Sequence, residues 1–509
     1  MGHQGTRLKR LALVAALVSF LVPNGSTAHG AVAPTVTNTN TPNVLFILLD
    51  EASMWSLLRT DGTINANRFP GFAALAQNST WYRDTMTTAQ WTYFAVPALL
   101  SGREASFDKG PTFEEWPRNI FTAFKGTLKM DVQEPVTGLC PRTLCRRPMQ
   151  KNRLMAPSDH VLRMYDAIGR AANDPVPGLH FVHAVVPHHP WALTTEMRFS
   201  QNIEDDPRPG TIVDRKRDSY QSHLRQYTAV DAVVGDMIRT MKASPNWDDT
   251  MIVVTADHGL TFAPGSNIRD KVDPTKKYAL DDVFRVPLFI KYPHQSTGAV
   301  SDCVASSMDI LPTVLSATGA RTGWKFDGVD LTKGCPKRVS RHVHWPKGET
   351  DVNSHFKDLL ARVRFYDGWI DAEGTADDIA RVGLSGSLVG TTVPAAAETD
   401  DRVQWKLHRA KDFRTIGFQR FSFVPGRATG NYRVLRTIGP RTEGLIVVDG
   451  VITGVVAELA GQKKSNAWNF FSSGQLTSAL HPGSHVVEMW TATWVDGVAA
   501  LRRVGPPTR

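Results

Sequence analysis

The chain has 509 residues, of which 42% are hydrophobic and 21% are charged, and its formal net charge at pH 7 is +9. This length exceeds one ordinary domain, and the apolar fraction excludes a chain that is disordered throughout, so we expect two domains or a large domain with an appendage. The positive charge suits an anionic partner, although a merely solvated surface explains it equally well. Because no basic run is interleaved with aromatic residues, nothing indicates nucleic acid.

The amino-terminal segment has the pattern of a secretory signal peptide. Cations at positions 7, 9 and 10 precede an apolar run from Leu11 to Val22, and small residues end near Ala28. The apolar run is shorter than the roughly 20 residues that a membrane-spanning helix requires, although an uncleaved signal anchor is the alternative. We expect residues 1–28 to be cleaved and 29–42 to be a flexible linker. The mature chain, with a charge of +6, is then secreted or periplasmic, at the exterior of the cell envelope, without a transmembrane span.

The next 300 or so residues alternate apolar runs with amphipathic segments. Continuous apolar runs predict strands, because a strand covered on both faces carries apolar residues at every position. These strands are expected at 43–49, 180–186, 251–255 and 286–291. Helices are expected at 67–76, from about 158 onward, at 218–242 and at 309–317, whereas 104–157 is expected to be irregular. The alternation predicts an α/β domain with a doubly wound, mostly parallel sheet over residues 43–345.

After about residue 345 the pattern changes to short alternating runs and turns. Residues 445–448 and 451–459, joined by Asp449-Gly450, predict a β-hairpin, and residues 485–495 predict another strand. We therefore expect residues 346–509 to form a smaller β-rich domain.

The four cysteines fit an oxidising compartment. Cys140 and Cys145 lie five residues apart, and Cys303 and Cys335 follow later in the chain. Four cysteines allow three pairings, of which we favour the near-neighbour pair together with the longer one. A zinc site is the weaker alternative, because neither pair has the two-residue spacing of a zinc knuckle.

Two of the predicted strands end on acidic residues. Asp50-Glu51 follows the first strand, and Asp257-His258 follows the third. Because ligands of open α/β sheets bind beyond the carboxyl ends of the strands, these side chains can converge although about 200 residues separate the two groups. Their oxygen and imidazole ligands suit one divalent ion, Mg²⁺, Mn²⁺ or Zn²⁺.

Thr92 stands just ahead of an apolar run that closes on Ser101-Gly102. A threonine hydroxyl is a poor nucleophile at neutral pH and requires a base or a metal ion. A divalent ion bound by the four strand-end residues, with Thr92 as the remaining ligand, would activate the hydroxyl toward phosphorus or sulfur. Taken singly, an acidic strand end is often a helix cap and Asp-His-Gly is often a turn, so only their joint placement favours catalysis.

Six motifs occur in an order that resembles the alkaline phosphatase/sulfatase superfamily, in particular its sulfatase-like domain. They are NVLFILLDE, TYFAVPALLSG, PHHP, MIVVTADHG, VPLFI and MDILPTVLSATG, and they cover about residues 43–345. Sulfatases carry a cysteine, converted to formylglycine, ten residues before a glycine, and phosphoethanolamine transferases carry their nucleophile five residues before a proline. Gly102 and Pro97 place both positions on Thr92, so the resemblance implies that Thr92 is the nucleophile.

Two departures change the implied chemistry. A threonine cannot become formylglycine, and His258 replaces the asparagine of the sulfatase Asp-Asn-Gly, which disfavours Ca²⁺. The site therefore resembles those of lipoteichoic-acid synthase-like and phosphoethanolamine transferases. The resemblance implies a metal-dependent hydrolase or transferase of phosphate esters that acts through a phosphothreonine, on an anionic envelope lipid or polymer or on a small phosphoester. The alternatives are a sulfatase-type sulfuric ester hydrolase and a non-catalytic envelope-binding protein.

The resemblance also implies roles for residues around the nucleophile. His188, in PHHP, matches a histidine that binds a substrate oxygen, and it could stabilise transition-state charge or protonate the leaving group. His189 and His183 are candidate second-metal or substrate ligands, although histidines near strand ends are more often structural. Lys276 matches a substrate-binding lysine by ungapped counting, Arg269 is its rival, and both could be solvated surface charges. One metal is favoured, because no histidine lies between His258 and His294.

Overall fold

The structure is a computed structural model that describes residues 41–145, 156–200, 212–264, 277–417, 419–459 and 467–507. The expected signal peptide, most of the linker, Arg269 and Lys276 lie outside the described residues. The chain divides into residues 1–35 and 36–509, and the description that follows concerns the second unit. Among the residues described, no helix combines the length and the apolar character needed to cross a membrane.

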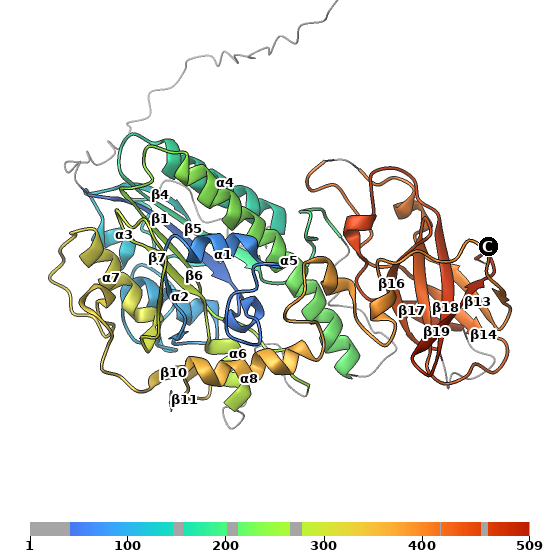
Figure 1. The fold of residues 1–509 in the computed structure, drawn as a ribbon. Coiled ribbons are helices and arrows are strands. Elements are labelled where there is room, and N and C mark those ends of the chain that lie inside the picture. Colours follow the sequence, from blue (N-terminus) through green and yellow to red (C-terminus); the bar gives the residue numbers. More distant parts are fainter. Residues whose placement is uncertain are drawn as a thin grey trace, which may run out of the picture. The chain divides into compact units, whose positions relative to one another are not determined.

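A seven-stranded sheet organises the first part of this unit (Figure 1). In spatial order its strands are β4 (Lys129–Gln133), β5 (Gly178–Pro187), β1 (Asn43–Asp50), β6 (Thr250–Ala256), β7 (Leu288–Lys291), β2 (Thr80–Tyr82) and β8 (Ala299–Ser301). The first four strands run parallel to one another, whereas β7 is antiparallel to both of its neighbours. The predicted α/β fold with a mostly parallel sheet is confirmed, and the expected strands and helices are present with ends shifted by a few residues.

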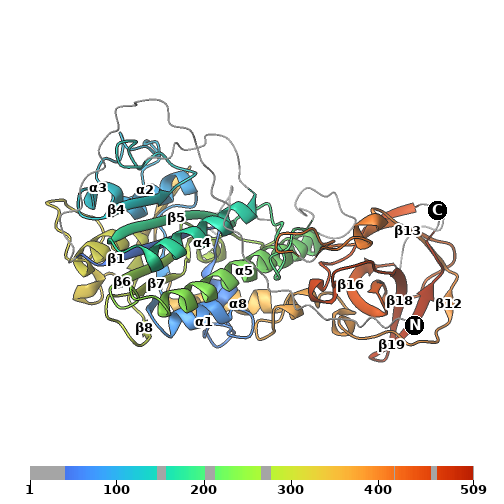
Figure 2. The same cartoon turned by 90° about the horizontal axis from the view of Figure 1, so that it is seen from above.

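Helices cover both faces of the sheet (Figure 2). One face packs against α1 (Pro70–Ala76), α4 (Pro157–Asn173) and α5 (Ile212–Lys242), and the other against α2 (Thr92–Ser101), α3 (Ile120–Ala123) and α7 (Ile310–Ala317). Alternate residues of β1 therefore enter two separate apolar clusters, Leu45 and Ile47 on one side, Val44 and Phe46 on the other. Because both faces of β1 are buried, its sequence is apolar at almost every position.

The expectation that residues 104–157 are irregular is wrong in part. This segment contributes α3 and the edge strand β4, which pairs in parallel with β5. The sequence of β4, KMDVQ, is polar and mostly half-buried, so it carries none of the apolar signal of the inner strands. An edge strand is paired on one side only and needs less apolar surface, which explains the omission.

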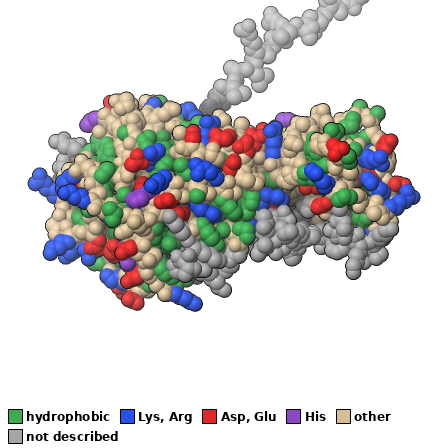
Figure 3. All heavy atoms as spheres, turned by 60° about the horizontal axis from the view of Figure 1, so that its bottom comes forward, with side chains coloured by type: hydrophobic (Ala, Val, Ile, Leu, Met, Phe, Trp, Pro, Cys, Tyr) green, Lys and Arg blue, Asp and Glu red, His purple; other side chains and the backbone are tan. Residues whose placement is uncertain are grey.

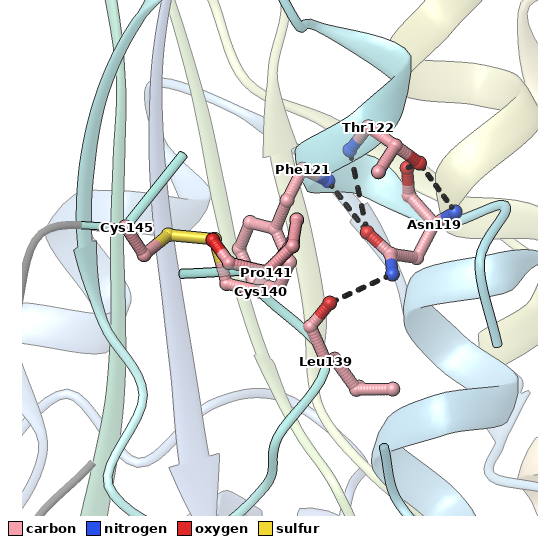
Figure 4. Close-up of a disulfide and its surroundings, with 7 residues drawn as sticks. All are labelled: Asn119, Phe121, Thr122, Leu139, Cys140, Pro141 and Cys145. Carbon is pink, nitrogen blue, oxygen red and sulfur yellow. Dashed lines mark hydrogen bonds between the residues drawn. A yellow bond between two sulfur atoms is a disulfide. The ribbon is translucent and has the colours of Figure 1, made fainter. Parts of the chain in front are cut away.

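The predicted cysteine pairing is confirmed. Disulfides join Cys140 to Cys145 and Cys303 to Cys335. The first lies beside the amino end of α3, where the Asn119 side chain accepts hydrogen bonds from two backbone N–H groups of that helix (Figure 4). The Asn119 amide also donates to the Leu139 carbonyl oxygen at 3.0 Å. The helix cap and the disulfide loop therefore share one side chain.

The carboxyl-terminal region is β-rich, as expected. A five-stranded sheet has the order β12 (Thr399–Asp400), β19 (Val498–Val504), β18 (Val487–Val495), β15 (Thr442–Val448) and β16 (Val451–Glu458). A three-stranded sheet contains β13 (Val403–Leu407), β14 (Thr429–Val434) and β17 (Ala467–Phe471). In the predicted hairpin, Asp449 and Gly450 both have positive φ, 49° and 82°, which the two central residues of a type I′ turn require.

Residues 341–367 pack against the α/β part of the molecule. They form the hairpin of β10 (Arg341–Trp345) and β11 (Gly348–Val352) and the helix α8 (Phe356–Asp367). The Tyr366 ring stacks on Trp55, with ring centroids 3.9 Å apart. The division into domains at residue 345 stays a prediction. On the face drawn in Figure 3, the described Lys and Arg side chains are interspersed with Asp and Glu rather than gathered in one patch.

A buried ion-pair network joins this segment to the rest. Asp84 forms ion pairs with Arg285, which is fully buried, and with Arg341 on β10 at 2.6 Å. Arg285 also donates to Ser354 Oγ at 2.6 Å. Burial raises the pKa of Asp84, but the two guanidinium groups outweigh burial and hold it below its ordinary value. The carboxylate therefore stabilises the fold at neutral pH, and this stabilisation is lost as the pH falls through the lowered pKa.

We expect Asp84→Asn to lower the free energy of unfolding by about 3 kcal/mol, because it removes the counter-ion of the buried Arg341 and leaves Arg285 only Asp281, at 3.4 Å. Chemical denaturation monitored by fluorescence measures the change. Asp302→Asn is the matched control, because the Asp302 side chain is 66% exposed and forms an ion pair with Arg83 at the surface. This variant should lower the free energy of unfolding by about 1 kcal/mol or less. Equal losses in the two variants would contradict the assigned role of Asp84.

Candidate active site

The sheet topology gathers residues from three adjacent strands. β5, β1 and β6 are neighbours and run in the same direction, so their carboxyl ends lie at one edge of the sheet. Asp50 is the last residue of β1, Asp257 follows β6 directly, and His183 lies in β5 opposite Leu48 of β1. The structure thus brings together Asp50 and Asp257, as expected from the sequence, and adds His183 to them.

Asp50, His183 and Asp257 form a compact buried cluster. Their ligand atoms all lie within 4.8 Å of one another, and the three residues are 2%, 0% and 0% exposed. His183 Nε2 is 3.9 Å from Asp50 Oδ2. Asp50 Oδ1, Asp257 Oδ2 and His183 Nε2 have no hydrogen-bond partner in the described part of the chain, although each atom is buried. Buried polar atoms normally have partners, so this group of two carboxylates and an imidazole fits a bound cation.

The electrostatics of the cluster support this interpretation. Burial raises the pKa of Asp50, and the adjacent Asp257 carboxylate raises it further, while nearby histidines lower it. Burial lowers the pKa of His183, but the charge and hydrogen bonds of Glu134, followed by Asp50 and Asp257, raise it to about 9. The carboxylates around His183 therefore stabilise positive charge in this cluster, including a proton on the imidazole. Two carboxylates and one imidazole also fit a divalent cation as ligands.

Glu51 occupies a strained turn beside this cluster. Its φ is 61°, a left-handed conformation that a residue other than glycine adopts at a cost of about 1 to 3 kcal/mol. Its backbone N–H donates to Asp257 Oδ1 at 3.3 Å, so the neighbouring acidic residue holds the turn. The Glu51 carboxylate lies 3.6 Å from His188 Nε2. Glu51 thus connects the buried cluster to the His188 loop.

Thr92 is the first residue of α2, and its Oγ1 lies 3.3 Å from His258 Nε2. His258 Nδ1 lies 2.9 Å from the Gly259 carbonyl oxygen, which can only accept, so Nδ1 carries the proton. In the neutral ring, Nε2 is then an acceptor or ligand atom that faces both Thr92 and, at 3.4 Å, Asp257 Oδ2. Gly259 permits this turn, because a Cβ there would lie 2.6 Å from the Asp282 carbonyl oxygen.

His188 belongs to the loop that follows β5. Its Nδ1 donates to the His189 carbonyl oxygen, so Nε2 is directed to Glu51. The buried Gln226 on α5 donates to the His188 carbonyl oxygen at 2.7 Å and accepts from the backbone N–H groups of Ala192 and Leu193. His189 reaches the site through its backbone N–H, which donates to Glu51 Oε2 at 3.4 Å.

Two supporting residues escaped the sequence analysis. Glu134 lies 2.9 Å from His183 Nδ1, which fixes the ring so that Nε2 points to the carboxylates. Gln226 holds the His188 loop. Glu134 follows the edge strand β4, which carries no apolar signal, and Gln226 lies within a helix whose spacing indicates only packing. Lys276 and Arg269 lie outside the described residues, so their expected roles stay predictions.

A cavity of about 650 Å³ lies at the opposite end of α2 from Thr92, and none of the residues above lines it. Its wall includes Ser101, Arg103 and Trp116. Thr92 and Ser101 are nine residues apart along the helix, which corresponds to about 13 Å. The cavity is therefore separate from the buried cluster.

Comparisons with known proteins agree with the motifs. The family model described as Sulfatase matches residues 42–320. The chain is 27% identical over 171 residues to an ulvan-active sulfatase of Formosa agariphila, a match that covers 32% of this chain and 33% of that protein. It is 28% identical over 131 residues to the multifunctional alkaline phosphatase superfamily protein PehA of Trinickia caryophylli, covering 25% and 24%. The matched segments therefore span a third or less of these two relatives.

Among solved structures, the phosphonate monoester hydrolase SpPMH from Silicibacter pomeroyi aligns with a TM-score of 0.43 and 19% identity. The alignment covers 59% of this chain and 79% of that one.

We expect Glu134→Gln to weaken divalent metal binding by about 10- to 100-fold, because an amide no longer fixes the His183 ring as the carboxylate does. Calorimetric titration of chelator-treated protein with Mn²⁺ measures the change. The exposed Glu114 lies close in sequence and provides the matched control, Glu114→Gln, which should bind Mn²⁺ like the unmodified protein. An unchanged affinity in Glu134→Gln would contradict the role of Glu134 in fixing the His183 ring.

Proposed function

Because this chain belongs to the sulfatase family, whose model matches more than half of it, we propose that it is a metal-dependent hydrolase or transferase of phosphate esters with Thr92 as its nucleophile. The observation that carries this proposal is the position of the Thr92 hydroxyl, 3.3 Å from the acceptor nitrogen of His258 and at the amino end of a helix. The positive end of a helix favours an anionic group such as a phosphate.

The buried cluster supports a cation requirement. Asp50, Asp257 and His183 would hold one divalent ion, with Glu51 and His258 adjacent. Bound there, the ion would supply the positive charge that lowers the pKa of the Thr92 hydroxyl and offsets charge on the substrate. Two carboxylates with one imidazole suit Mn²⁺ or Zn²⁺, and Mg²⁺ could bind through the carboxylate oxygens, whereas Ca²⁺ is disfavoured because it takes about six to eight oxygen ligands.

The residues of the chain then divide the reaction into two displacements. The Thr92 oxygen attacks phosphorus, its proton passes to His258 Nε2, and the bond from phosphorus to the leaving oxygen breaks. His188 is held by His189 with Nε2 directed into the site, where a proton on that nitrogen can be given to the leaving oxygen. Water or an alcohol next attacks phosphorus and gives its proton to His188 Nε2, while the bond from phosphorus to the Thr92 oxygen breaks and His258 Nε2 returns its proton to that oxygen. Water gives hydrolysis, and an alcohol gives transfer.

An anionic polymer or lipid of the cell envelope, or a small phosphoester, is the proposed substrate. The charge of +6 expected for the mature chain favours approach of an anion. Secretion would give the chain access to such envelope components, and the amino-terminal pattern of cations followed by an apolar run supports it.

Hydrolysis of a sulfuric ester is the second candidate, and the relatives favour it. The ulvan-active sulfatase of Formosa agariphila shares 27% identity with this chain over 171 residues. Against it stands Thr92, which cannot be converted to the formylglycine implied for sulfatases by the superfamily resemblance. Sulfate release by this chain would require a different nucleophile from those enzymes.

We expect Thr92→Ala to lower kcat/KM for bis(p-nitrophenyl) phosphate with Mn²⁺ by about 10³-fold or more, because no other group replaces a nucleophile. Thr92→Ser retains a hydroxyl and should recover a measurable part of the activity. Thermal unfolding of both variants checks that the fold is intact. An alanine variant with undiminished turnover would exclude Thr92 as the nucleophile.

Paired substrates decide between the two candidate reactions. We expect kcat/KM for bis(p-nitrophenyl) phosphate to exceed that for p-nitrophenyl sulfate by at least about tenfold, corresponding to about 1.4 kcal/mol. Peptide mapping of acid-quenched enzyme should locate a phosphoryl group on Thr92. Preferential release of sulfate would favour the second candidate, and no turnover of either ester would favour a non-catalytic binding protein.

A further inference from the structure

The β10–β11 hairpin carries a second group of potential metal ligands, distant in sequence from the buried cluster. His342 and His344 alternate with Val343, which is fully buried, so both imidazoles project from the opposite face of the strand. Across the hairpin, His344 pairs with Glu349 and His342 pairs with Asp351. Ligand atoms of His342, His344 and Glu349 all lie within 4.8 Å of one another.

Two of the three distances among these ligand atoms are close to those of a tetrahedral site. Glu349 Oε2 is 3.2 Å from His344 Nδ1 and 3.6 Å from His342 Nε2. Ligand bonds of about 2.0 to 2.1 Å at tetrahedral angles place neighbouring ligand atoms about 3.3 Å apart. The two distances from Glu349 therefore already suit one ion, and the partial exposure of the His342 and His344 side chains, 34% and 14%, leaves room for water as a further ligand.

The second nitrogen of each histidine contacts a different carboxylate. His342 Nδ1 is 3.0 Å from Asp351 Oδ1, and His344 Nε2 is 3.3 Å from Glu104 Oε2. Carboxylates that accept the outer N–H of metal-binding histidines fix the ring and its tautomer, and metal sites use this arrangement repeatedly. A simple surface ion pair needs one carboxylate per histidine, whereas here each ring lies between two.

Two imidazoles and one carboxylate select the metal. This set favours Zn²⁺ or a similar transition ion over Mg²⁺ and Ca²⁺, which prefer oxygen ligands.

The hairpin also contacts the segments that precede and follow α2. The His344 backbone N–H donates to the Thr88 carbonyl oxygen at 2.8 Å, four residues before Thr92. Glu104, which contacts the His344 ring, lies three residues beyond Ser101, the last residue of α2. In Figure 1, β10 and β11 lie near the same part of the molecule as α2. An ion that fixes the His344 ring would restrain the segments on both sides of α2.

We propose that His342, His344 and Glu349 form a surface Zn²⁺ site, separate from the buried cluster, that anchors the β10–β11 hairpin against the two ends of α2. This proposal does not depend on the reaction catalysed. The ion at this site has a positioning role, because none of its three ligands belongs to the candidate active site.

In the experiment, the full chain is treated with chelator, loaded with Zn²⁺ and dialysed, and mass spectrometry of the metal measures the Zn²⁺ that is retained. Asp257→Asn impairs the buried cluster, so the experiment is done in this variant. About one equivalent of Zn²⁺ per chain should remain bound to it. Adding His344→Asn should remove that equivalent. His294→Asn is the matched control: His294 is an exposed histidine 3.5 Å from a single carboxylate, Asp249, and its φ of 60° is one that asparagine tolerates.

A second measurement tests whether bound Zn²⁺ also anchors the β10–β11 hairpin. Zn²⁺ should slow amide hydrogen exchange in residues 85–91 and 341–352 of the Asp257→Asn protein, and this slowing should disappear with His344→Asn. Thermal unfolding without metal checks that each variant folds, because the His344 side chain is 14% exposed whereas that of His294 is 73% exposed. If Asp257→Asn protein retains no Zn²⁺, or if His344→Asn loses no more than His294→Asn does, the site is excluded. Zn²⁺ bound without slower exchange would exclude its anchoring role.

Discussion

Two carboxylates buried side by side, Asp50 and Asp257, set the constraint on which the rest of the candidate active site depends. Burial and the adjacent Asp257 carboxylate both raise the pKa of Asp50. The imidazole of His183 offsets part of this repulsion, and Glu134 in turn holds that imidazole. A divalent cation would offset the repulsion between the carboxylates more strongly, because it carries two positive charges. The cluster is therefore stable only when it contains positive charge, which links the fold at this point to metal binding.

Such a cluster can persist only if its backbone cannot relax. β1 is buried on both faces and paired with β5 and β6 along its length, so Asp50 cannot move away from Asp257 without breaking the centre of the sheet. The His188 loop is held in the same way by Gln226 of α5. One turn earlier on that helix, Gln221 accepts from the Gly474 N–H in the carboxyl-terminal region. A single helix thus contacts both the site and the β-rich part of the chain.

The sequence predicted those parts of the structure that depend on local apolar patterning. Strand β1 and the edge at which Asp50 and Asp257 meet followed from apolar runs and from the geometry of parallel sheets. The edge strand β4 did not, because a strand of half-buried polar residues has no such pattern. The role of Glu134 was invisible for a related reason: it depends on a contact with His183, 49 residues away, that no local signal encodes. The same holds for His344 and Glu104, which are 240 residues apart.

The reaction class depends on Thr92 more than on the charged cluster. A phosphodiester and a sulfate monoester each carry one negative charge on a tetrahedral centre of similar size, so a cation with carboxylate and imidazole ligands attracts both. Electrostatics at the strand ends therefore cannot distinguish them, which explains how a common scaffold can serve both chemistries. The nucleophile would distinguish them, because a threonine, unlike the cysteine of sulfatases, cannot be converted to an aldehyde and can react only through its hydroxyl. Under the proposed function, the hydroxyl at the start of α2, 3.3 Å from the acceptor nitrogen of His258, would therefore form a phosphate ester that is cleaved by attack at phosphorus.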